Sequence, residues 1–125
     1  MTDAPDEKTI ELAHQMFDLA RQGETERLAA YVDAGVPVNL TDAQGNTLLM
    51  LAAYHGHAAT VTALAERGAD VNRVNDRGQS PLAGAVFKDE GGVVTALLAA
   101  DADPDAGSPT ARETAAMFGR PDLFG

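Results

Sequence analysis

Two histidines separated by one residue, His55 and His57, are the side chains in this sequence best suited by type to bind a metal ion. Imidazole nitrogens are common zinc ligands. However, side chains two positions apart at the end of a helix point in different directions, and no obvious third ligand lies nearby in the sequence. We therefore expect both histidines to have a structural or surface role and to bind no metal.

Three aspartates at alternate positions, Asp101-Ala-Asp103-Pro-Asp105, resemble the start of a calcium-binding loop. Such a loop requires glycine at its sixth position and glutamate at its twelfth. Those places hold Ala106 and Arg112. We therefore expect no calcium site here.

Catalytic groups are scarce. The chain has no cysteine, and its two serines are Ser80 and Ser108. Ser80 precedes Pro81, which together make a strong helix start, and Ser108 lies in a predicted tight turn. No glycine-rich phosphate loop or paired-carboxylate pattern is present. We expect no catalytic residue, no cofactor and no enzymatic activity.

A repeat with a period of 33 residues must position whatever site the chain has. Residues one period apart match in type, for example Gly45 with Gly78, Leu49 with Leu82, Val61 with Val94, Gly56 with Gly23 and Asn72 with Asn39. A fixed period of this length predicts a stacked array in which no unit buries its apolar face alone. With 125 residues we predict one domain over residues 1–125, with repeats of about 8–40, 41–73, 74–106 and 107–125, the last of them partial.

Each repeat is predicted to contain a turn, a helix, a loop and a second helix. In the second repeat, Asp42-Ala-Gln-Gly45 favours a type I turn closed by a residue with positive φ. Thr47 then caps a helix that runs to about His55, Gly56 ends it, and a second helix continues to Gly68.

The first repeat begins with apolar residues at helical spacing and acids in the first turns, and Gly23 follows as a stop. The main stripe is Ile10, Ala13, Phe17 and Ala20; the acids are Asp6, Glu7 and Glu11. Leu12, Met16 and Leu19 lie off that stripe, so we interpret this helix as an adapted end cap. The second helix is predicted from about Glu24 to Asp33.

The third and fourth repeats depart from the pattern. Asp89 and Asp101 replace the two glycine stops of the third repeat, and Gly91-Gly92 weakens the start of its second helix. We therefore expect this repeat to be the least stable. The fourth repeat has a turn region three residues shorter and begins its helix with Thr110-Ala-Arg-Glu113, a capping box. After Pro121, Leu123 and Phe124 can fold back as a C-terminal plug.

These residues resemble the ankyrin repeat. The resemblance is carried by Gly45-Asn-Thr-Leu-Leu-Met-Leu-Ala-Ala-Tyr-His-Gly-His57, Val61-Thr-Ala-Leu-Ala65 and Gly68-Ala-Asp-Val-Asn72, and it covers nearly the whole chain. The amino-acid sequences of repeats two and three are similar to those of small free-standing bacterial ankyrin proteins. The resemblance implies an all-α solenoid of helix-turn-helix repeats joined by β-hairpin-like loops, with three full repeats and a partial fourth. It also implies a non-catalytic module for protein–protein interaction.

The resemblance has one consistent departure. The histidine that opens the first helix of the family repeat is replaced by Phe17, Met50, Ala83 and Glu113. Its usual hydrogen bonds must therefore come from elsewhere or be missing. His57, in contrast, occupies the position of the family's Gly-His pair, which implies that it braces a loop.

By position in the family repeat, the partner-binding residues are expected at the turns and at the exposed ends of the first helices. They are Arg21, Gln22, Ala43, Gln44, Asn46, Tyr54, His55, Asp76, Arg77, Gln79, Phe87, Lys88, Met117 and Phe118. Tyr54, Phe87 and Met117 share one repeat position and should form a ladder. Two interpretations stay open: these side chains anchor a partner, or they pack between repeats or against the C-terminal plug.

The formal net charge of −10 argues against binding to nucleic acid or to anionic lipid. The longest apolar run is too short to span a bilayer, and the acidic start, Met1-Thr-Asp-Ala-Pro-Asp-Glu7, predicts no conventional signal peptide. The absence of cysteine fits a cytoplasmic location. We expect a monomer that binds a protein with a basic patch; the alternatives are a self-associating structural protein and a sensor that depends on a metal or ligand.

Overall fold

A computed structural model of the chain describes residues 7–125. Within them, seven helices follow one another: α1 (Glu7–Gln22), α2 (Thr25–Asp33), α3 (Leu48–Tyr54), α4 (Ala58–Glu66), α5 (Pro81–Phe87), α6 (Gly91–Ala99) and α7 (Ala111–Met117). Asp6, predicted in the first turns of the first helix, lies outside the described residues. None of the helices between residues 7 and 125 is long and apolar enough to cross a lipid bilayer.

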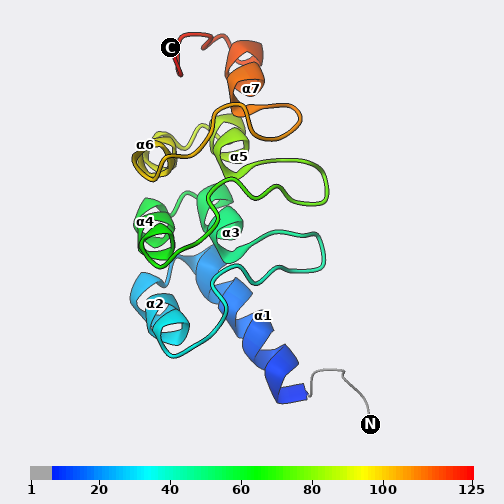
Figure 1. The fold of residues 1–125 in the computed structure, drawn as a ribbon, viewed down its shortest axis with the longest axis vertical. Coiled ribbons are helices and arrows are strands. Elements are labelled where there is room, and N and C mark those ends of the chain that lie inside the picture. Colours follow the sequence, from blue (N-terminus) through cyan, green and yellow to red (C-terminus); the bar gives the residue numbers. More distant parts are fainter. Residues whose placement is uncertain (1–6) are drawn as a thin grey trace.

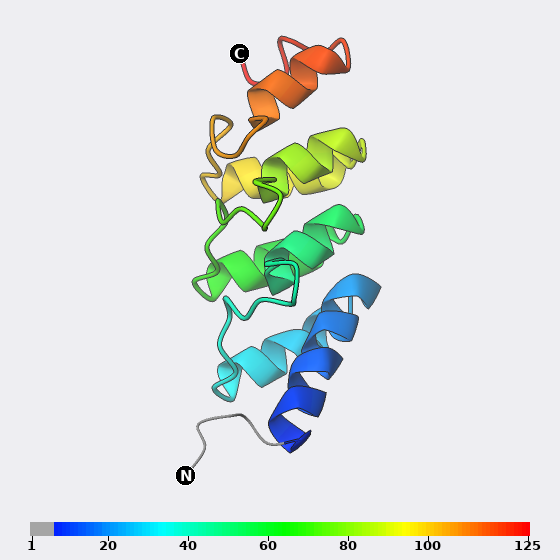
Figure 2. The same cartoon turned by 90° about the vertical axis from the view of Figure 1, so that its right-hand side faces the viewer.

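The helices form two parallel columns (Figure 1). The inner column is α1, α3, α5 and α7, the outer column is α2, α4 and α6, and successive members of each column pack on one another. Long loops project to one side of the inner column (Figure 1), and the layers follow one another in sequence order (Figure 2). The predicted all-α repeat solenoid is confirmed. The exact repeat boundaries stay a prediction.

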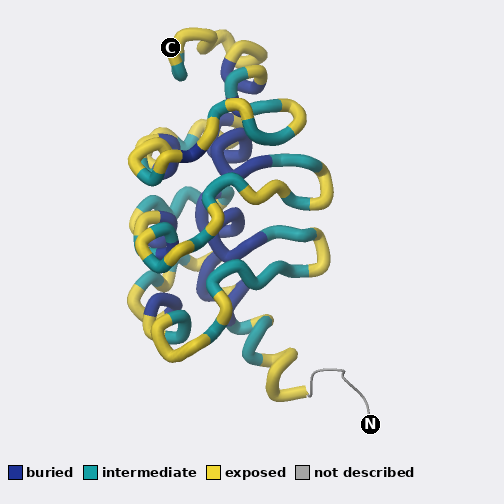
Figure 3. Tube along the Cα trace, in the orientation of Figure 1, coloured by how far each residue is buried: buried dark blue, intermediate teal, exposed yellow. Residues whose placement is uncertain are grey.

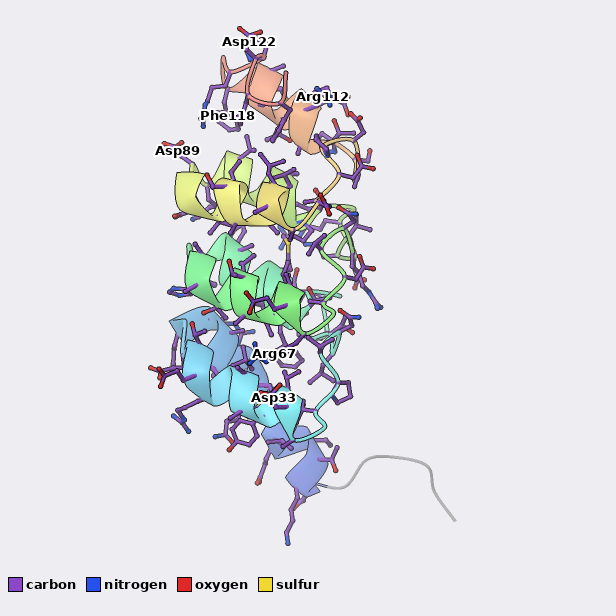
Figure 4. The ribbon with its side chains drawn as sticks, turned by 60° about the vertical axis from the view of Figure 1, so that its left-hand side comes forward. Asp33, Arg67, Asp89, Arg112, Phe118 and Asp122 are labelled. Atoms are coloured by element: carbon purple, nitrogen blue, oxygen red, sulfur yellow. The ribbon has the colours of Figure 1, made fainter. Side chains whose placement is uncertain are left out.

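The core lies between the two columns (Figure 3). Leucines one repeat apart, Leu49 and Leu82 on the inner helices and Leu64 and Leu97 on the outer helices, are all buried. A repeat on its own has no neighbouring layer to cover these side chains. The stack therefore buries apolar side chains that no single repeat can bury. Outer helices are also joined at the surface, where the Arg67 guanidinium lies 2.9 Å from the Asp33 carboxylate (Figure 4).

The predicted helix starts are confirmed. The Thr47 hydroxyl accepts a hydrogen bond from the Met50 amide, and the Ser80 hydroxyl accepts one from the Ala83 amide. The capping box of α7 is complete, because Thr110 and Glu113 each accept from the other's backbone N–H at 3.0 Å. Each cap satisfies an amide that the first turn of a helix leaves without a partner.

The helix stops adopt the left-handed backbone conformation, as predicted. Gly56 and Gly68, which follow α3 and α4, have φ of 82° and 89°. Asp89 and Asp101 occupy the same conformation after α5 and α6, with φ of 57° and 64°. The third repeat therefore keeps the geometry of a glycine stop with a residue that has a Cβ.

The apolar stripe predicted for the first helix is partly wrong. Phe17 and Ala20 are buried, but Ile10 is 43% exposed, and Met16 and Leu19, placed off the stripe, are buried. The reason is geometric: α1 extends beyond α2 (Figure 2), so no other described helix covers its exposed first turn, residues 7–10, while α1 packs further along against α2 and α3.

The C-terminal residues fold back on the stack, as predicted. Leu123 and Phe124 are partly buried against the core. The Arg112 guanidinium donates a hydrogen bond to the Phe124 carbonyl at 3.2 Å and pairs with the Asp105 carboxylate. This arginine thus ties the chain end to the short turn that precedes α7.

Successive projecting turns are joined by hydrogen bonds that involve no histidine. Asn75 donates from its side chain to the Asn46 side chain at 2.9 Å, which joins two successive turns, and the Asp76 amide donates to the Gln44 carbonyl. Among residues 7–125, no buried side-chain nitrogen or oxygen lacks a hydrogen-bond partner. The buried positions of Phe17, Met50 and Ala83 therefore demand no polar partner.

Candidate functional site

The residues predicted to bind a partner lie on one side of the molecule, on the projecting turns and at the C-terminal ends of the inner helices. All fourteen are described, and none is buried: Arg21, Gln22, Ala43, Gln44, Asn46, Tyr54, His55, Asp76, Arg77, Gln79, Phe87, Lys88, Met117 and Phe118. This surface between the turns and the inner helices is called the groove below.

Side chains hold the turns of the groove in a fixed shape. Asp42 accepts hydrogen bonds from the amides of Gln44 and Asn46, both at 2.9 Å. Asn75 makes the same pair of bonds one repeat later, to the amides of Arg77 and Gln79. Such local bonds fix a turn without help from a partner. The groove is therefore formed before anything binds to it.

Three hollows follow one another along the groove. The first, about 350 Å³, lies between α1 and the first projecting turn, with His14, Phe17 and Asp42 among its lining residues. The second, about 130 Å³, lies beside α3 and reaches Asn75 and Arg77. The third, about 400 Å³, lies over α3, α5 and α7, with the following lining: Tyr54, Arg77, Gln79, Ala83, Phe87, Ser108, Pro109, Thr114 and Met117. The wall of this last hollow thus includes side chains from three successive repeats.

The ladder of Tyr54, Phe87 and Met117 lines the third hollow. Phe87 is 53% exposed and Met117 is 67% exposed, whereas Tyr54 is half-buried. The two side chains nearer the C-terminus are thus not buried between repeats. Lys88 lies over the Tyr54 ring, with the ammonium 5.0 Å from the ring centroid.

Phe87 also contacts an aromatic ring outside the ladder. The rings of Phe87 and Phe118 meet edge to face, with centroids 5.7 Å apart. Phe118 is itself 53% exposed and lies just beyond α7 (Figure 4). Phe87, Met117 and Phe118 therefore make one exposed apolar cluster at the C-terminal end of the inner column. Aromatic pairs of this geometry gain about 0.5–1.5 kcal/mol beyond the area that they bury.

Cationic groups gather at the ends of the inner helices. His55 is exposed, but partial desolvation lowers its pKa, and the nearby charges of His57, Arg21 and Lys88 lower it further. Each cation disfavours a second positive charge close by. Arg21 also pairs with Asp18 at 3.0 Å and with Asp42 at 3.8 Å. Among the fourteen residues, three are cationic (Arg21, Arg77, Lys88) and one is a carboxylate (Asp76).

The structure gives His57 a bracing role. Its Nε2 lies 2.7 Å from the Arg21 carbonyl oxygen, at hydrogen-bond distance across the boundary between the first two repeats. The ring also lies against Gly23, where an added Cβ would come within 2.5 Å of it. Within residues 7–125, no group of three or more His, Cys, Asp or Glu side chains is arranged to hold a metal ion.

The aspartate series has a structural role that repeats along the stack. The Asn72 side chain accepts a hydrogen bond from the Asp103 amide at 2.7 Å. The equivalent bond one repeat earlier joins Asn39 to the Asp70 amide at 2.8 Å. Asp103 in turn accepts from the Asp105 amide. These bonds bind each connecting loop to the next.

Sequence reasoning missed part of the groove. Ser108, Pro109, Ala83 and Thr114 line the third hollow, but turn residues were assigned only in repeats two and three. The shortened fourth turn was the available signal, because it brings residues 108 and 109 beside Gly78, whose carbonyl accepts from the Ser108 amide at 2.9 Å. A further hollow of about 410 Å³ between the outer helices α4 and α6, lined mainly by small side chains such as Ala65 and Ala96, was not predicted.

Comparison with known proteins places these features in context. A family model for ankyrin repeats, in three copies, matches residues 16–108. An ankyrin repeat protein of Pseudomonas aeruginosa is 54% identical over 65 residues, which cover 49% of this chain and 38% of that protein. The crystal structure of the human ASB11 ankyrin repeat domain matches with a TM-score of 0.67 and 34% identity, over 71% of this chain and 40% of that one. The matched part of this chain thus spans about two fifths of each relative's length.

Proposed function

This chain belongs to the ankyrin repeat family, whose repeats are generally non-catalytic modules for protein–protein interaction, and we propose on that premise that it binds a partner protein through the groove. The partner-binding residues would be the fourteen residues of the turns and inner-helix ends. A bacterial relative supports the resemblance to bacterial ankyrin proteins, and a cytoplasmic location is part of the proposal.

The observation that carries the proposal is the exposed part of the ladder. Phe87 and Met117 keep more than half of their surface in contact with water while lining a hollow of about 400 Å³. Large apolar side chains in a preformed hollow are typical anchors of an interface. Because the turns are already fixed by Asp42 and Asn75, little ordering entropy is lost when a partner binds.

The proposal can be tested by capture of partners from native lysate. The double variant Phe87→Ala/Met117→Ala should lose the proteins that the wild type retains. A matched control is Val74→Ala/Leu98→Ala, which removes two exposed apolar side chains that line none of the three hollows of the groove. Equal loss of partners in both variants, or retention in both, would contradict binding through the groove.

Self-association is the second candidate function. The cluster of Phe87, Met117 and Phe118 is exposed at the end of the inner column, and such a patch can also join two copies of a chain. We expect a monomer. Light scattering over a range of concentrations tests this. A wild-type dimer that becomes a monomer in the variant Phe118→Ser would favour the self-associating structural protein.

A sensor that depends on a metal or other ligand is the third candidate. Calorimetric titration with calcium and with zinc tests it directly. Heat that saturates at a simple stoichiometry, and that disappears when His55 and His57 are both replaced by alanine, would establish a site that we do not expect.

The sign of the partner's charge requires a distinction between the chain and the groove. The net charge of −10 favours a partner with a basic patch. That expectation rests on the charge of the whole chain, and it stays a prediction. The fourteen groove residues carry more cations than carboxylates, which bears on the segment that enters the groove.

A further inference from the structure

The two hollows beside α3, α5 and α7 contain a single charged side chain. The residues that line them are otherwise apolar or neutral polar, and the charged one, Arg77, borders both hollows. Asp76 precedes it in the turn but lines neither hollow, and it lies against Gly45 of the preceding repeat instead. The lining of these two hollows therefore carries one positive and no negative charge, in a strongly acidic protein.

The guanidinium of Arg77 has no partner among the described residues. Four other arginines, Arg21, Arg67, Arg112 and Arg120, each lie within 4 Å of a carboxylate. Arg77 is exposed, and its backbone amide, which donates to the Asn75 side chain at 3.0 Å, holds the residue in its turn. Its backbone is thus fixed while its charged head stays available to a ligand.

A segment that fills these hollows would cover Arg77. Removing a cation from water without an anion beside it is costly, since the attraction to the partner must offset the lost hydration. The neutral acceptors in the lining, such as Gln79 and Ser108, make weaker bonds to a guanidinium than a carboxylate does. A carboxylate from the incoming segment satisfies Arg77 and can do so through two parallel hydrogen bonds.

The rim and the ladder define the rest of the segment. Lys88 lies over the ring of Tyr54, which lines the third hollow, so a second cation stands near this part of the groove. Phe87 and Met117 offer apolar surface beside Arg77. Resting on the proposed function of the groove, we propose that the groove binds a peptide segment in which an aspartate or glutamate stands close to a large apolar side chain. Arg77 binds the carboxylate, and the ladder covers the apolar group.

The probe for this proposal is a library of random 12-residue peptides displayed on phage and selected on the full chain at physiological salt. A labelled synthetic peptide with the enriched consensus is then measured by fluorescence anisotropy, beside a version whose acids are changed to the matching amides. The expected consensus places Asp or Glu next to Phe, Leu, Ile, Met or Trp. Arg77→Ala and the amide peptide should each weaken binding by about tenfold or more, as for the loss of a charged hydrogen bond.

Two controls make the result specific. Combining Arg77→Ala with the amide peptide should add little further loss, because both changes remove the same contact. Arg27→Ala removes another exposed cation, on α2, which lines none of the hollows of the groove, and it should leave the affinity unchanged.

Failure of the proposal can be told apart from failure of the proposed function. A consensus without acids, or binding that is insensitive to Arg77→Ala but lost in Phe87→Ala/Met117→Ala, overturns the anionic segment and leaves groove binding intact. Binding insensitive to all of these changes overturns both. A library from which no peptide is enriched also overturns the proposal, because a linear segment is what it specifies.

Discussion

Replacing Asp101 by glycine should stabilise the protein. Asp101 holds φ of 64° after α6, where Gly68 holds 89° after α4 in the preceding repeat. A residue with a Cβ bears a penalty of about 1 kcal/mol or more in this region, although aspartate tolerates it better than most. Its carboxylate makes no hydrogen bond to the described residues, so the substitution removes no contact that would offset the gain.

The size of the effect follows from three contributions. Relief of the backbone penalty gives about 1 kcal/mol, and removal of a negative charge from the C-terminal end of a helix gives about 0.3–1 kcal/mol. The greater freedom of glycine in the unfolded chain takes away about 0.5–1 kcal/mol. We therefore expect a net gain of about 0.3–1.5 kcal/mol, or a melting temperature higher by roughly 1–8 °C.

A short series of variants separates these contributions in urea melts. Asp101→Asn removes the charge and keeps a side chain that tolerates the left-handed conformation, so it should gain part of the stability. Asp101→Ala also removes the charge, but it places an unfavourable residue in that conformation and should be no more stable than the wild type. The reciprocal control is Gly68→Ala, whose added Cβ meets no atom within 4 Å, so that its loss of about 1 kcal/mol measures the backbone alone.

We therefore expect the urea midpoint of Asp101→Ala to be no higher than that of the wild type, and the midpoints of Asp101→Asn and Asp101→Gly to be higher than both. If Asp101→Ala is as stable as Asp101→Gly, the positive φ carries no penalty and the reasoning is wrong. An unchanged or lower midpoint for Asp101→Gly would refute the magnitude as well.

Three other predictions follow from the same structure. In urea melts, Phe87→Ala should lower the free energy of unfolding by well under the roughly 3–5 kcal/mol of a buried aromatic, because more than half of Phe87 is exposed. Tyr54→Ala should lower it by more than Phe87→Ala does. A large loss of stability in Phe87→Ala would mean that Phe87 packs within the fold rather than forming a binding surface. The lowered pKa of His55 favours its neutral form in the folded state. The stabilisation that this neutral form contributes to the free energy of unfolding is therefore fully present above the unfolded pKa of 6.5 and is lost as the pH falls below it. His55→Gln should flatten that part of the plot of stability against pH, and parallel plots for the two proteins would contradict this. Duplex DNA should show no sub-micromolar binding at physiological salt in an anisotropy titration, because a net charge of −10 offers no counterion release.

The sequence was sufficient to predict every helix start and stop that depends on a local rule. A cap such as Thr47 or Ser80 uses an amide three residues away, and a stop such as Gly56 needs only its own φ. Neither depends on what packs against the helix. The 33-residue period then fixed the order of the layers, because equivalent apolar positions can be buried only by stacking.

Exposure at the ends of the stack could not be predicted in the same way. Ile10 is exposed in the first turn of α1, and Met117 is exposed at the end of α7, the last helix of the inner column. Whether a repeat position is core or surface is decided by the adjacent repeat, which the pattern of one repeat does not contain. The sequence therefore left both interpretations of the ladder open, and the structure adds that Phe87 and Met117 are exposed.

The net charge of the chain and the charges of the groove support different expectations about the partner, for a physical reason. Several acids are present because turn chemistry requires them: Asp42 accepts two amide hydrogen bonds in a projecting turn, and Asp70 and Asp103 each accept one in a connecting loop. Asn75 accepts the equivalent pair of hydrogen bonds one repeat later without carrying a charge. The number of acids therefore partly reflects whether aspartate or asparagine occupies each turn. An aspartate used in this way contributes to the net charge without facing a ligand, whereas Arg77, with no carboxylate paired to it among the described residues, faces the hollows directly. The charge of a bound segment is therefore better inferred from the unpaired side chains that line the groove than from the total for the chain.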